Sequence, residues 1–346
     1  MLAVIYIIYI LKMLSKFRLL LTTIIITLSA LAAGCDNSSN FVSIEGEALG
    51  TFVQIKCKSA LPEQEIIQII EEVDNESKNS MSIFSSSSLL SRINRNETDS
   101  LDSHIAYNIE LARRFSELSD GAYDITIKPL TDAWGFGRTA SSTKINIDSL
   151  LEFVGYKMLN ITDNRVIKED SRIQIDLNSI AKGYTVDLIA QKLEALGIAD
   201  YMVNIGGEIR CKGHNQRGEE WSIAIETPYE GNMAMDSFEK IISVTDRAVA
   251  TSGNYRRFYT TAEGDKVVHT IDPKSGYSVI STLLSATVIA PTCAEADAAA
   301  TMFMSLGSSD KTTQLAEYCA KEYGWEYYFI YADGEEYRIV CSEGLK

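Results

Sequence analysis

The sequence predicts an α+β fold, a single large domain in which helices pack on a mixed, largely antiparallel sheet. Strand-like and helical stretches are mixed along the chain without the regular β-α-β alternation that builds parallel sheets. No G-x-G-x-x-G motif follows a strand, which argues against a Rossmann domain. The chain has 346 residues, of which 46% are hydrophobic and 23% charged, and only five are proline. This composition supports a packed core and excludes a disordered, collagen-like or coiled-coil protein.

The first 34 residues have the layout of a secretory signal. Lys16 and Arg18 form a basic region, Leu19–Leu31 is apolar, and small residues stand directly before Cys35. We therefore predict that residues 1–34 are the signal peptide of a bacterial lipoprotein. In that class the cysteine at the cleavage site becomes the new N-terminus and carries the lipid, so Cys35 is the predicted lipidation site (palmitate).

The polar stretch that starts at Cys35 is typical of a tether, predicted over residues 35–44, and residues 45–346 form the predicted folded domain. The alternative is an uncleaved transmembrane anchor, which the apolar stretch Met1–Leu11 favours. Both interpretations place the rest of the chain outside the cytoplasm. We expect an exported lipoprotein that is anchored to the membrane and faces the periplasm.

Acidic residues dominate the part of the chain after the leader. Lys and Arg number 32 against 47 Asp and Glu, which gives a net charge of −15. Three of the basic residues lie in the leader, so the remainder has 29 basic and 47 acidic residues and a net charge of −18. Such a surface repels nucleic acid, which is therefore not an expected partner. A phosphorylated ligand would need a cation to mediate its binding.

The cysteines after Cys35 are scattered and form no C-x-x-C pair. Their number is odd and their spacing irregular, so neither a zinc site nor a disulfide framework is predicted. We expect small buried apolar residues. They are Cys57, Cys211, Cys293, Cys319 and Cys341.

Several stretches predict helices by their apolar spacing and their ends. Pro62–Lys78 begins with proline and glutamates, which favour a helix start. Thr185–Leu196 has apolar residues on one face, and the glycine after it suits a C-terminal cap. The remaining predicted helices are His104–Leu118, Ala294–Leu306 and Lys311–Tyr323.

Strands are predicted where short apolar or alternating runs lie between turn signals. The last two form a hairpin, because Asp333-Gly334 between them is a favoured tight-turn pair. The predicted strands are Ile173–Leu177, Tyr201–Ile205, Trp221–Glu226, Ile241–Thr245, Leu283–Ala290, Glu326–Tyr331 and Glu335–Val340.

The first candidate site is the turn Asp176–Tyr184, between the strand predicted at Ile173–Leu177 and the helix from Thr185. Strand-to-helix turns expose backbone groups and side chains together, which suits phosphate or metal contact. The alternative is a helix cap followed by a solvated lysine, Lys182.

The second candidate is the pair Asp297 and Thr301 in the alanine-rich helix. Spacing i, i+4 puts the carboxylate and the hydroxyl on one face, one turn apart, and the alanines between them leave room for a ligand. Mg²⁺ takes oxygen ligands of this kind together with substrate phosphates. The alternative is an ordinary buried helix with a satisfied polar pair.

Two further segments carry candidate groups. His269 is one of three histidines, a residue type that can act as a general base near neutral pH, although a lone histidine is more often a bystander. Trp134 and Phe136 alternate with glycines and suit a planar ligand that backbone must approach closely. A tight turn beside a core tryptophan is the alternative there.

Taken in order, these segments resemble the ApbE family of FAD:protein FMN transferases, over roughly residues 45–306. The blocks that carry the resemblance are Ala48–Thr51, Met81–Phe84, Ser91–Asn94, Gly121–Pro129, Trp134–Gly137, Asp176–Tyr184, Asn204–Glu208, Ala250–Tyr255, His269–Gly276 and Glu295–Thr301.

The resemblance implies an enzyme that holds FAD with Mg²⁺ and transfers FMN to a threonine or serine hydroxyl of an exported acceptor protein, releasing AMP. The acceptor pattern implied is D-x-x-[ST]-G-[AS]-T, found on subunits of ion-pumping redox complexes. The alternative is a lipoprotein that binds FAD, or hydrolyses it, without transferring FMN to protein. A solute-binding lipoprotein is a third option, without a two-lobed pattern to support it.

The resemblance also implies residue roles. Asp297 and Thr301 match metal-binding side chains, and Ser179 matches a backbone oxygen ligand. His269 matches a histidine proposed as the base, with Asp297 as second choice. The implied FAD-binding residues are Leu49, Phe84, Ala133, Trp134, Gly135, Asp176, Lys182, Thr270 and Ile271. Phe84 stands where the family often has tyrosine, Leu49 where methionine is common, and Asn178 where a smaller residue is usual; none of these removes a metal ligand.

Overall fold

The computed structural model describes residues 40–137, 146–229, 237–255, 258–260 and 266–346. Phe41–Lys346 forms one compact unit. The predicted signal peptide and Cys35 lie outside the described residues. Among the residues that are described, no helix has both the length and the apolar character needed to cross a membrane.

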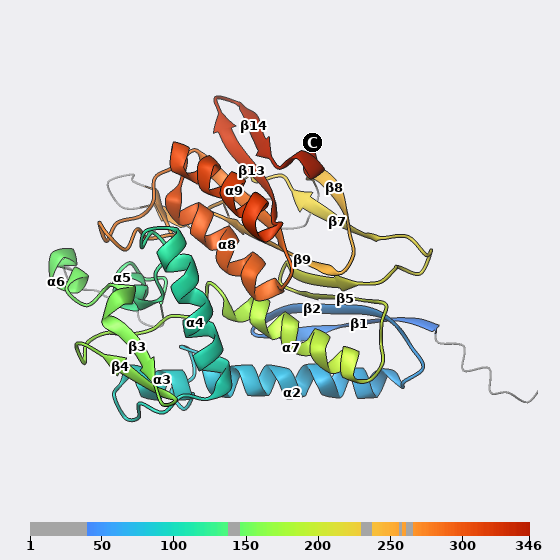
Figure 1. Cartoon of the computed structure of the whole chain (residues 1–346), viewed down its shortest axis with the longest axis horizontal. Helices are drawn as coiled ribbons and strands as arrows, with labels where there is room; N and C mark the ends of the chain where they lie inside the picture. Colours follow the sequence, from blue (N-terminus) through green and yellow to red (C-terminus); the bar gives the residue numbers. More distant parts are fainter. Residues whose placement is uncertain (1–39, 138–145, 230–236, 256–257, 261–265) are drawn as a thin grey trace, which may run out of the picture. The chain divides into compact units, whose positions relative to one another are not determined.

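An eight-stranded sheet organises this unit, with strand order β1-β2-β5-β6-β9-β12-β13-β14 (Figure 1). The register is antiparallel at every pairing from β2 to β14, which confirms the predicted α+β fold with its largely antiparallel sheet. The strands are β1 (Asn40–Ala48), β2 (Thr51–Ser59), β5 (Tyr201–Ile205), β6 (Glu208–Lys212), β9 (Arg247–Gly253), β12 (Leu283–Ala290), β13 (Glu326–Asp333) and β14 (Glu336–Cys341).

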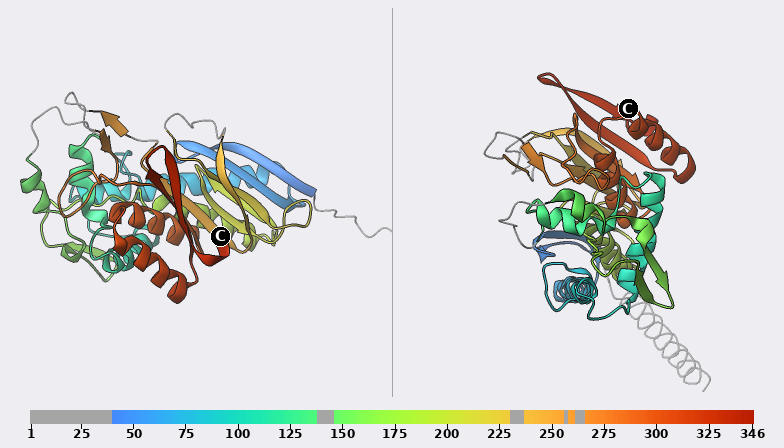
Figure 2. Two further views of the ribbon diagram at one scale, coloured as in Figure 1. Left: turned by 90° about the horizontal axis from the view of Figure 1, so that it is seen from above. Right: turned by 90° about the vertical axis from the view of Figure 1, so that its left-hand side faces the viewer.

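Helices cover one face of the sheet because alternate strand residues point toward them (Figures 1 and 2). Near β2 and β5 the core lies under α2 and α7, and near β12 and β13 it lies under α8 and α4. The main helices are α2 (Glu63–Met81), α4 (Ser103–Leu118), α7 (Ala181–Ala195), α8 (Cys293–Leu306) and α9 (Asp310–Tyr323).

The opposite face is covered by the hairpin of β7 (Trp221–Glu226) and β8 (Phe238–Val244). Its inward residues pack on the alternate positions of the sheet, such as Met202, Val249 and Ile330. The middle strands of the sheet are therefore buried on both faces. Shorter elements complete the described chain: α3 (Leu89–Asn94), α5 (Lys128–Ala133), α6 (Ile147–Leu151), β3 (Leu159–Thr162), β4 (Arg165–Lys168), β10 (Phe258–Thr260), β11 (Lys266–Val268) and the 3₁₀ turns Ile125–Ile127, Tyr156–Met158 and Glu343–Leu345.

One predicted strand is wrong. Residues 173–177 are buried but belong to no strand. The Asn94 side chain donates to the Ile175 carbonyl at 2.8 Å and accepts from its amide at 2.7 Å. The Asp176 amide donates to the Ile125 carbonyl at 2.8 Å. A side chain and a turn thus take the place of a neighbouring strand.

Other ends differ by a few residues. α7 begins at Ala181, four residues before its predicted start, and β1 begins at Asn40, within the stretch 35–44 predicted as a tether. Four of the five described cysteines are buried and Cys341 is partly buried, and none of the five forms a disulfide.

Candidate active site

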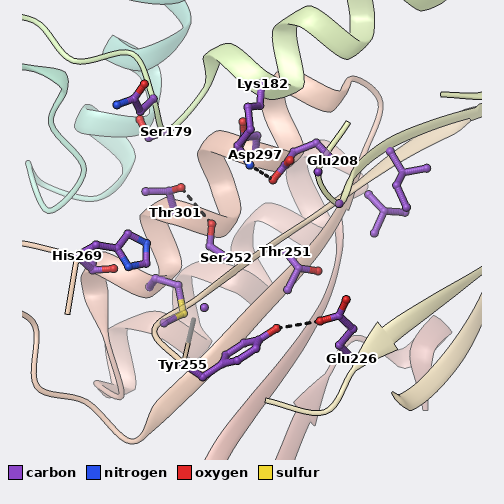
Figure 3. A pocket seen from close by; sticks show the side chains of 18 of the residues that line it. Ser179, Lys182, Glu208, Glu226, Thr251, Ser252, Tyr255, His269, Asp297 and Thr301 are labelled. Carbon is purple, nitrogen blue, oxygen red and sulfur yellow. Dashed lines mark hydrogen bonds and ion pairs between the residues drawn. The ribbon is translucent and has the colours of Figure 1, made fainter. Parts of the chain in front are cut away.

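A cavity of about 630 Å³ opens beside the N-terminal turns of α7 and α8, a size within the range of small-molecule sites (Figure 3). Strands β5, β6 and β9, the β7–β8 hairpin and the segment around residues 122–136 supply its other walls. Eight of the residues predicted for the site line it: Asp176, Ser179, Lys182, His269, Thr270, Ile271, Asp297 and Thr301.

Two buried carboxylates lie at one end of the cavity. The Lys182 ammonium pairs with Glu208 Oε1 at 2.5 Å, and Asp297 Oδ2 accepts the Gly183 amide at 3.0 Å (Figure 3). Burial, and then the charge of Glu208, raise the pKa of Asp297, although Lys182 opposes this. When both carboxylates are ionised, a single lysine leaves this cluster with a net negative charge.

This cluster fits a bound cation. Glu208 Oε2 is buried and has no hydrogen-bond partner among the described residues. The described residues contain no group of three or more His, Cys, Asp and Glu placed to hold a metal ion. The predicted metal ligands are one carboxylate, one hydroxyl and one backbone oxygen. Such a set suits a hard cation such as Mg²⁺ better than zinc.

The side-chain hydroxyls of Thr301 and Ser179 have partners of their own. Thr301 lies one helical turn after Asp297, and its Oγ1 is 3.1 Å from Ser252 Oγ. Ser179 Oγ lies 2.8 Å from the Tyr123 hydroxyl, whose pKa burial raises. The structure thus brings the three predicted metal-binding residues to the same cavity.

Gly183 lets α7 and α8 approach each other closely. A Cβ at this position would lie 2.6 Å from the Cys293 carbonyl carbon and 2.8 Å from Asp297 Cβ, with the Cys293 carbonyl oxygen closer still. Only glycine fits between the two helices here. This contact places Lys182 and Asp297, from segments far apart in the sequence, beside each other.

His269 and its neighbours line the side of the cavity away from this cluster (Figure 3). The His269 ring contacts Phe136 edge to face, with centroids 6.3 Å apart. Thr270 Oγ1 donates to Asn254 Oδ1 at 2.7 Å, which fixes the strand end. Asp176 is buried, its carboxylate accepts the Asn178 amide at 2.9 Å, and burial raises its pKa.

Five predicted FAD-binding residues do not line the cavity. Trp134 Nε1 donates to the Gly276 carbonyl at 2.7 Å, and its ring packs against a small apolar cluster. Leu49 forms the β1–β2 turn with φ of 53°, and its amide donates to Asp74. Phe84 is 53% exposed. The others are Ala133 and Gly135.

Three residues of the cavity lining carry polar groups to which the sequence assigns no role. Glu208 lies in a matched block, after the Gly206-Gly207 turn, yet its burial and its pairing with Lys182 emerge only when β6 is placed beside α7. Tyr255 and Glu226, joined at 3.4 Å, come from β9's end and the β7–β8 hairpin, which the sequence does not connect. The glycine pair before Glu208 is the one signal that marks it.

The fold and the cavity define an α+β protein with a cavity of small-molecule size beside a cluster of buried charged groups. The chain belongs to the ApbE family, whose model matches residues 49–329. This membership and the enzyme class confirm the predictions from the sequence. Residues on the cavity wall come from seven of the ten sequence blocks that suggested the family: Gly121–Pro129, Trp134–Gly137, Asp176–Tyr184, Asn204–Glu208, Ala250–Tyr255, His269–Gly276 and Glu295–Thr301.

Relatives and solved structures agree. The chain is 35% identical over 291 residues to an FAD:protein FMN transferase of Vibrio cholerae, covering 80% of this chain and 85% of the relative. It is 33% identical over 321 residues to one of Haemophilus influenzae, covering 87% and 90%. The structure of the flavin transferase ApbE from Vibrio cholerae superposes with a TM-score of 0.78 at 30% identity, covering 88% of this chain and 98% of that one.

Proposed function

We propose that this chain is an FAD:protein FMN transferase that moves FMN from FAD to a threonine or serine hydroxyl of an exported acceptor protein and releases AMP. The names of its relatives support the FAD and protein substrates. The observation that carries the proposal is the Lys182–Glu208–Asp297 cluster at one end of a cavity of about 630 Å³. A dinucleotide with a charged diphosphate and apolar rings suits such a cavity.

Asp297, Thr301 and the backbone at Ser179 would hold a Mg²⁺ ion, which would supply Lewis-acid stabilisation of charge at the diphosphate. Lys182 adds a point charge of the same sign beside it. Without these positive charges a diphosphate would enter a chain with a net charge of −18 after its leader. The dependence on Mg²⁺ is part of the proposal.

The acceptor hydroxyl needs a base, and His269 is our candidate. The hydroxyl oxygen bonds to the FMN phosphorus, and its proton passes to a ring nitrogen of His269. The bond from that phosphorus to the bridging oxygen breaks, and AMP leaves with that oxygen and its electron pair. A positioned base contributes about 10²–10⁴-fold, so alignment and charge stabilisation carry the larger share.

The proposed acceptor rests on the family resemblance, and the proposed location rests on the layout of the leader. We propose that the acceptor bears D-x-x-[ST]-G-[AS]-T and is a subunit of a redox complex. The leader supports an exported lipoprotein, anchored through Cys35 and facing the periplasm.

One incubation separates this function from the alternatives. The domain is mixed with FAD, Mg²⁺ and a peptide that bears the acceptor pattern, and the peptide is weighed by mass spectrometry. We expect the peptide to gain the mass of one FMN group, and we expect no gain when the incubation contains EDTA. Free FMN and AMP with unmodified peptide would identify a hydrolase, and intact FAD would identify a carrier. Either of these would refute the proposal.

A further inference from the structure

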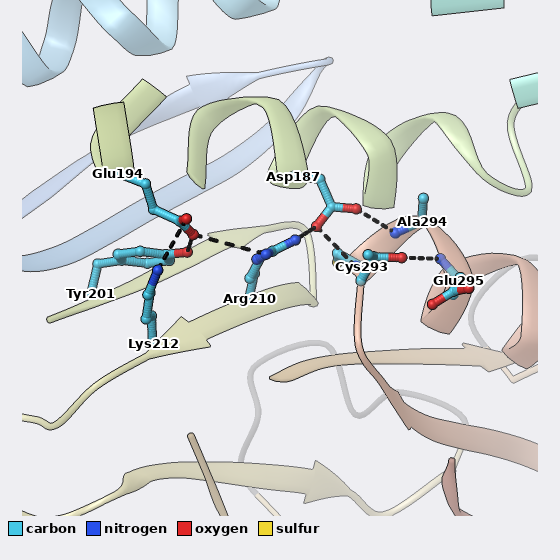
Figure 4. Close-up of polar contacts among 9 residues, drawn as sticks. Asp187, Glu194, Tyr201, Arg210, Lys212, Cys293, Ala294 and Glu295 are labelled. Carbon is cyan, nitrogen blue, oxygen red and sulfur yellow. Dashed lines mark hydrogen bonds and ion pairs between the residues drawn. The ribbon is translucent and has the colours of Figure 1, made fainter. Parts of the chain in front are cut away.

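Two matched contacts join the N-terminal turns of α7 and α8. The carboxylate of Asp187, in α7, accepts the backbone amides of Cys293 and Ala294 at 3.0 and 2.9 Å (Figure 4). In the opposite direction Asp297, in α8, accepts the Gly183 amide at 3.0 Å. On each helix the aspartate lies four residues after an amide that the other aspartate binds, so amide and carboxylate share one face.

Asp187 is also fixed from the side of the sheet. Its carboxylate, whose side chain is 5% exposed, pairs with Arg210 of β6 at 2.6 Å (Figure 4). Glu194 lies 3.8 Å from Arg210 and pairs with Lys212 at 3.0 Å, and it accepts the Tyr201 hydroxyl at 2.5 Å. The start of α8 is thereby tied to β6 as well as to α7.

The same two elements carry the cluster at the cavity. Glu208 and Arg210 lie two residues apart on β6 and share one face of the sheet. Lys182–Glu208 and Asp187–Arg210 are therefore two α7–β6 ion pairs of opposite polarity. The first pair includes cavity-lining residues, and the second lies behind it, outside the lining.

We propose that Asp187 is a positioning residue for FMN transfer. By holding the first turn of α8, it fixes Asp297 beside the Lys182–Glu208 pair. This inference rests on the proposed function. Asp187 acts through α8, since it does not line the cavity. Outer groups that orient metal ligands typically change metal affinity or activity by about 10–100-fold when they are replaced.

The test is Asp187→Asn, which keeps the size of the side chain and removes its charge. We expect the Mg²⁺ concentration for half-maximal FMN transfer to rise about tenfold or more. Backbone amides at the start of α8 should exchange hydrogen faster in the ligand-free protein, measured by mass spectrometry. The matched control is Asp102→Asn, because Asp102 accepts the Ile105 amide at 2.8 Å at the start of α4, away from the cavity. It should leave the Mg²⁺ requirement unchanged.

The double variant Asp187→Asn/Arg210→Gln also removes the arginine charge that Asp187 balances, and it serves as well if the single variant does not fold. We expect it to keep the raised Mg²⁺ requirement and the faster exchange. If the Mg²⁺ requirement and the amide exchange both returned to their wild-type values, the proposal would be overturned. The change seen in Asp187→Asn would then come from the charge left on Arg210. Unchanged values in Asp187→Asn would overturn it too.

Failure of the proposed function is distinguishable. If the wild-type protein transfers no FMN, the transferase assignment fails. Amide exchange at α8, and the dependence of FAD affinity on Mg²⁺ measured by flavin fluorescence, then still test Asp187. Wild-type values of both in Asp187→Asn would overturn the positioning role, and shifted values would support it.

Discussion

Replacing Gly183 by alanine tests how closely α7 and α8 must approach. The new methyl group would lie 2.6 Å from the Cys293 carbonyl carbon and 2.8 Å from Asp297 Cβ. Both neighbours are held close to the backbone and cannot rotate away as the end of a long side chain could. The two helices must separate, and the hydrogen bond from the Gly183 amide to Asp297 must lengthen or break.

The expected change in stability is a difference of opposing contributions. Alanine stabilises the interior of a helix by about 1 kcal/mol relative to glycine. Overpacking costs about 1–3 kcal/mol, and losing a hydrogen bond to a charged group costs about 1.5–3 kcal/mol. The free energy of unfolding should therefore fall by about 1.5–5 kcal/mol. α7 has no side-chain cap of its own, so loss of the hydrogen bond from Gly183 to Asp297 should destabilise the first turn of α7.

Urea unfolding followed by circular dichroism measures this difference, and the peptide assay measures the rate of FMN transfer. We expect FMN transfer to slow more than 10-fold, measured under conditions in which the unfolding curve shows the variant to be fully folded. Gly46→Ala is the control, because a Cβ there would meet only Val53 at an ordinary 3.6 Å. A Gly183→Ala protein with wild-type stability and wild-type transfer would refute the close-approach argument.

Three further predictions concern charge and proton transfer. Asp297→Asn should lower Mg²⁺-dependent transfer by more than about 100-fold, and transfer at a comparable rate would remove the metal assignment. His269→Ala should slow transfer by about 10²–10⁴-fold while FAD binding, followed by flavin fluorescence, persists; unchanged turnover would give the base role to another group. Burial lowers the pKa of Lys168 to about 8, from 10.5 in the unfolded chain. Between these values the unfolded chain holds more protons, so unfolding free energy should rise with pH relative to Lys168→Gln; parallel pH profiles would contradict this.

Helices and hairpins whose signals are local could be predicted from the sequence. The α8 and α9 starts lie within one residue of prediction, because apolar spacing and capping residues occupy the same short stretch. The strands Tyr201–Ile205 and Leu283–Ala290 match their predicted bounds because both are short apolar runs between turn signals.

The segment at Ile173–Leu177 fails for a physical reason. Its alternating apolar residues do point into the core, as in a strand, but its backbone partner is the side chain of Asn94, 81 residues earlier. The burial pattern of a segment and its hydrogen-bond partners are separate properties. Only the burial pattern can be predicted from the local sequence.

The candidate site divides in the same way. Asp297 and Thr301 reach the cavity because helical spacing fixes their shared face. The sequence at Trp134 is compatible with a ligand-binding residue and with a core residue; in this structure Trp134 Nε1 donates to the Gly276 carbonyl, and its role toward FAD stays a prediction. The role of Asp187 depends on two helices and a strand meeting, which no single stretch of sequence contains.

The buried thiols have a consequence for how the chain must mature. Burial raises the pKa of Cys57 to about 11 and of Cys319 to about 12, and it raises those of Cys211 and Cys293 as well. In the folded state few thiolates are therefore offered to oxidants. In the unfolded chain, before the sheet forms, the same thiols are unprotected. For a chain exported to an oxidising compartment, as we propose, folding would then compete with the formation of mispaired disulfides.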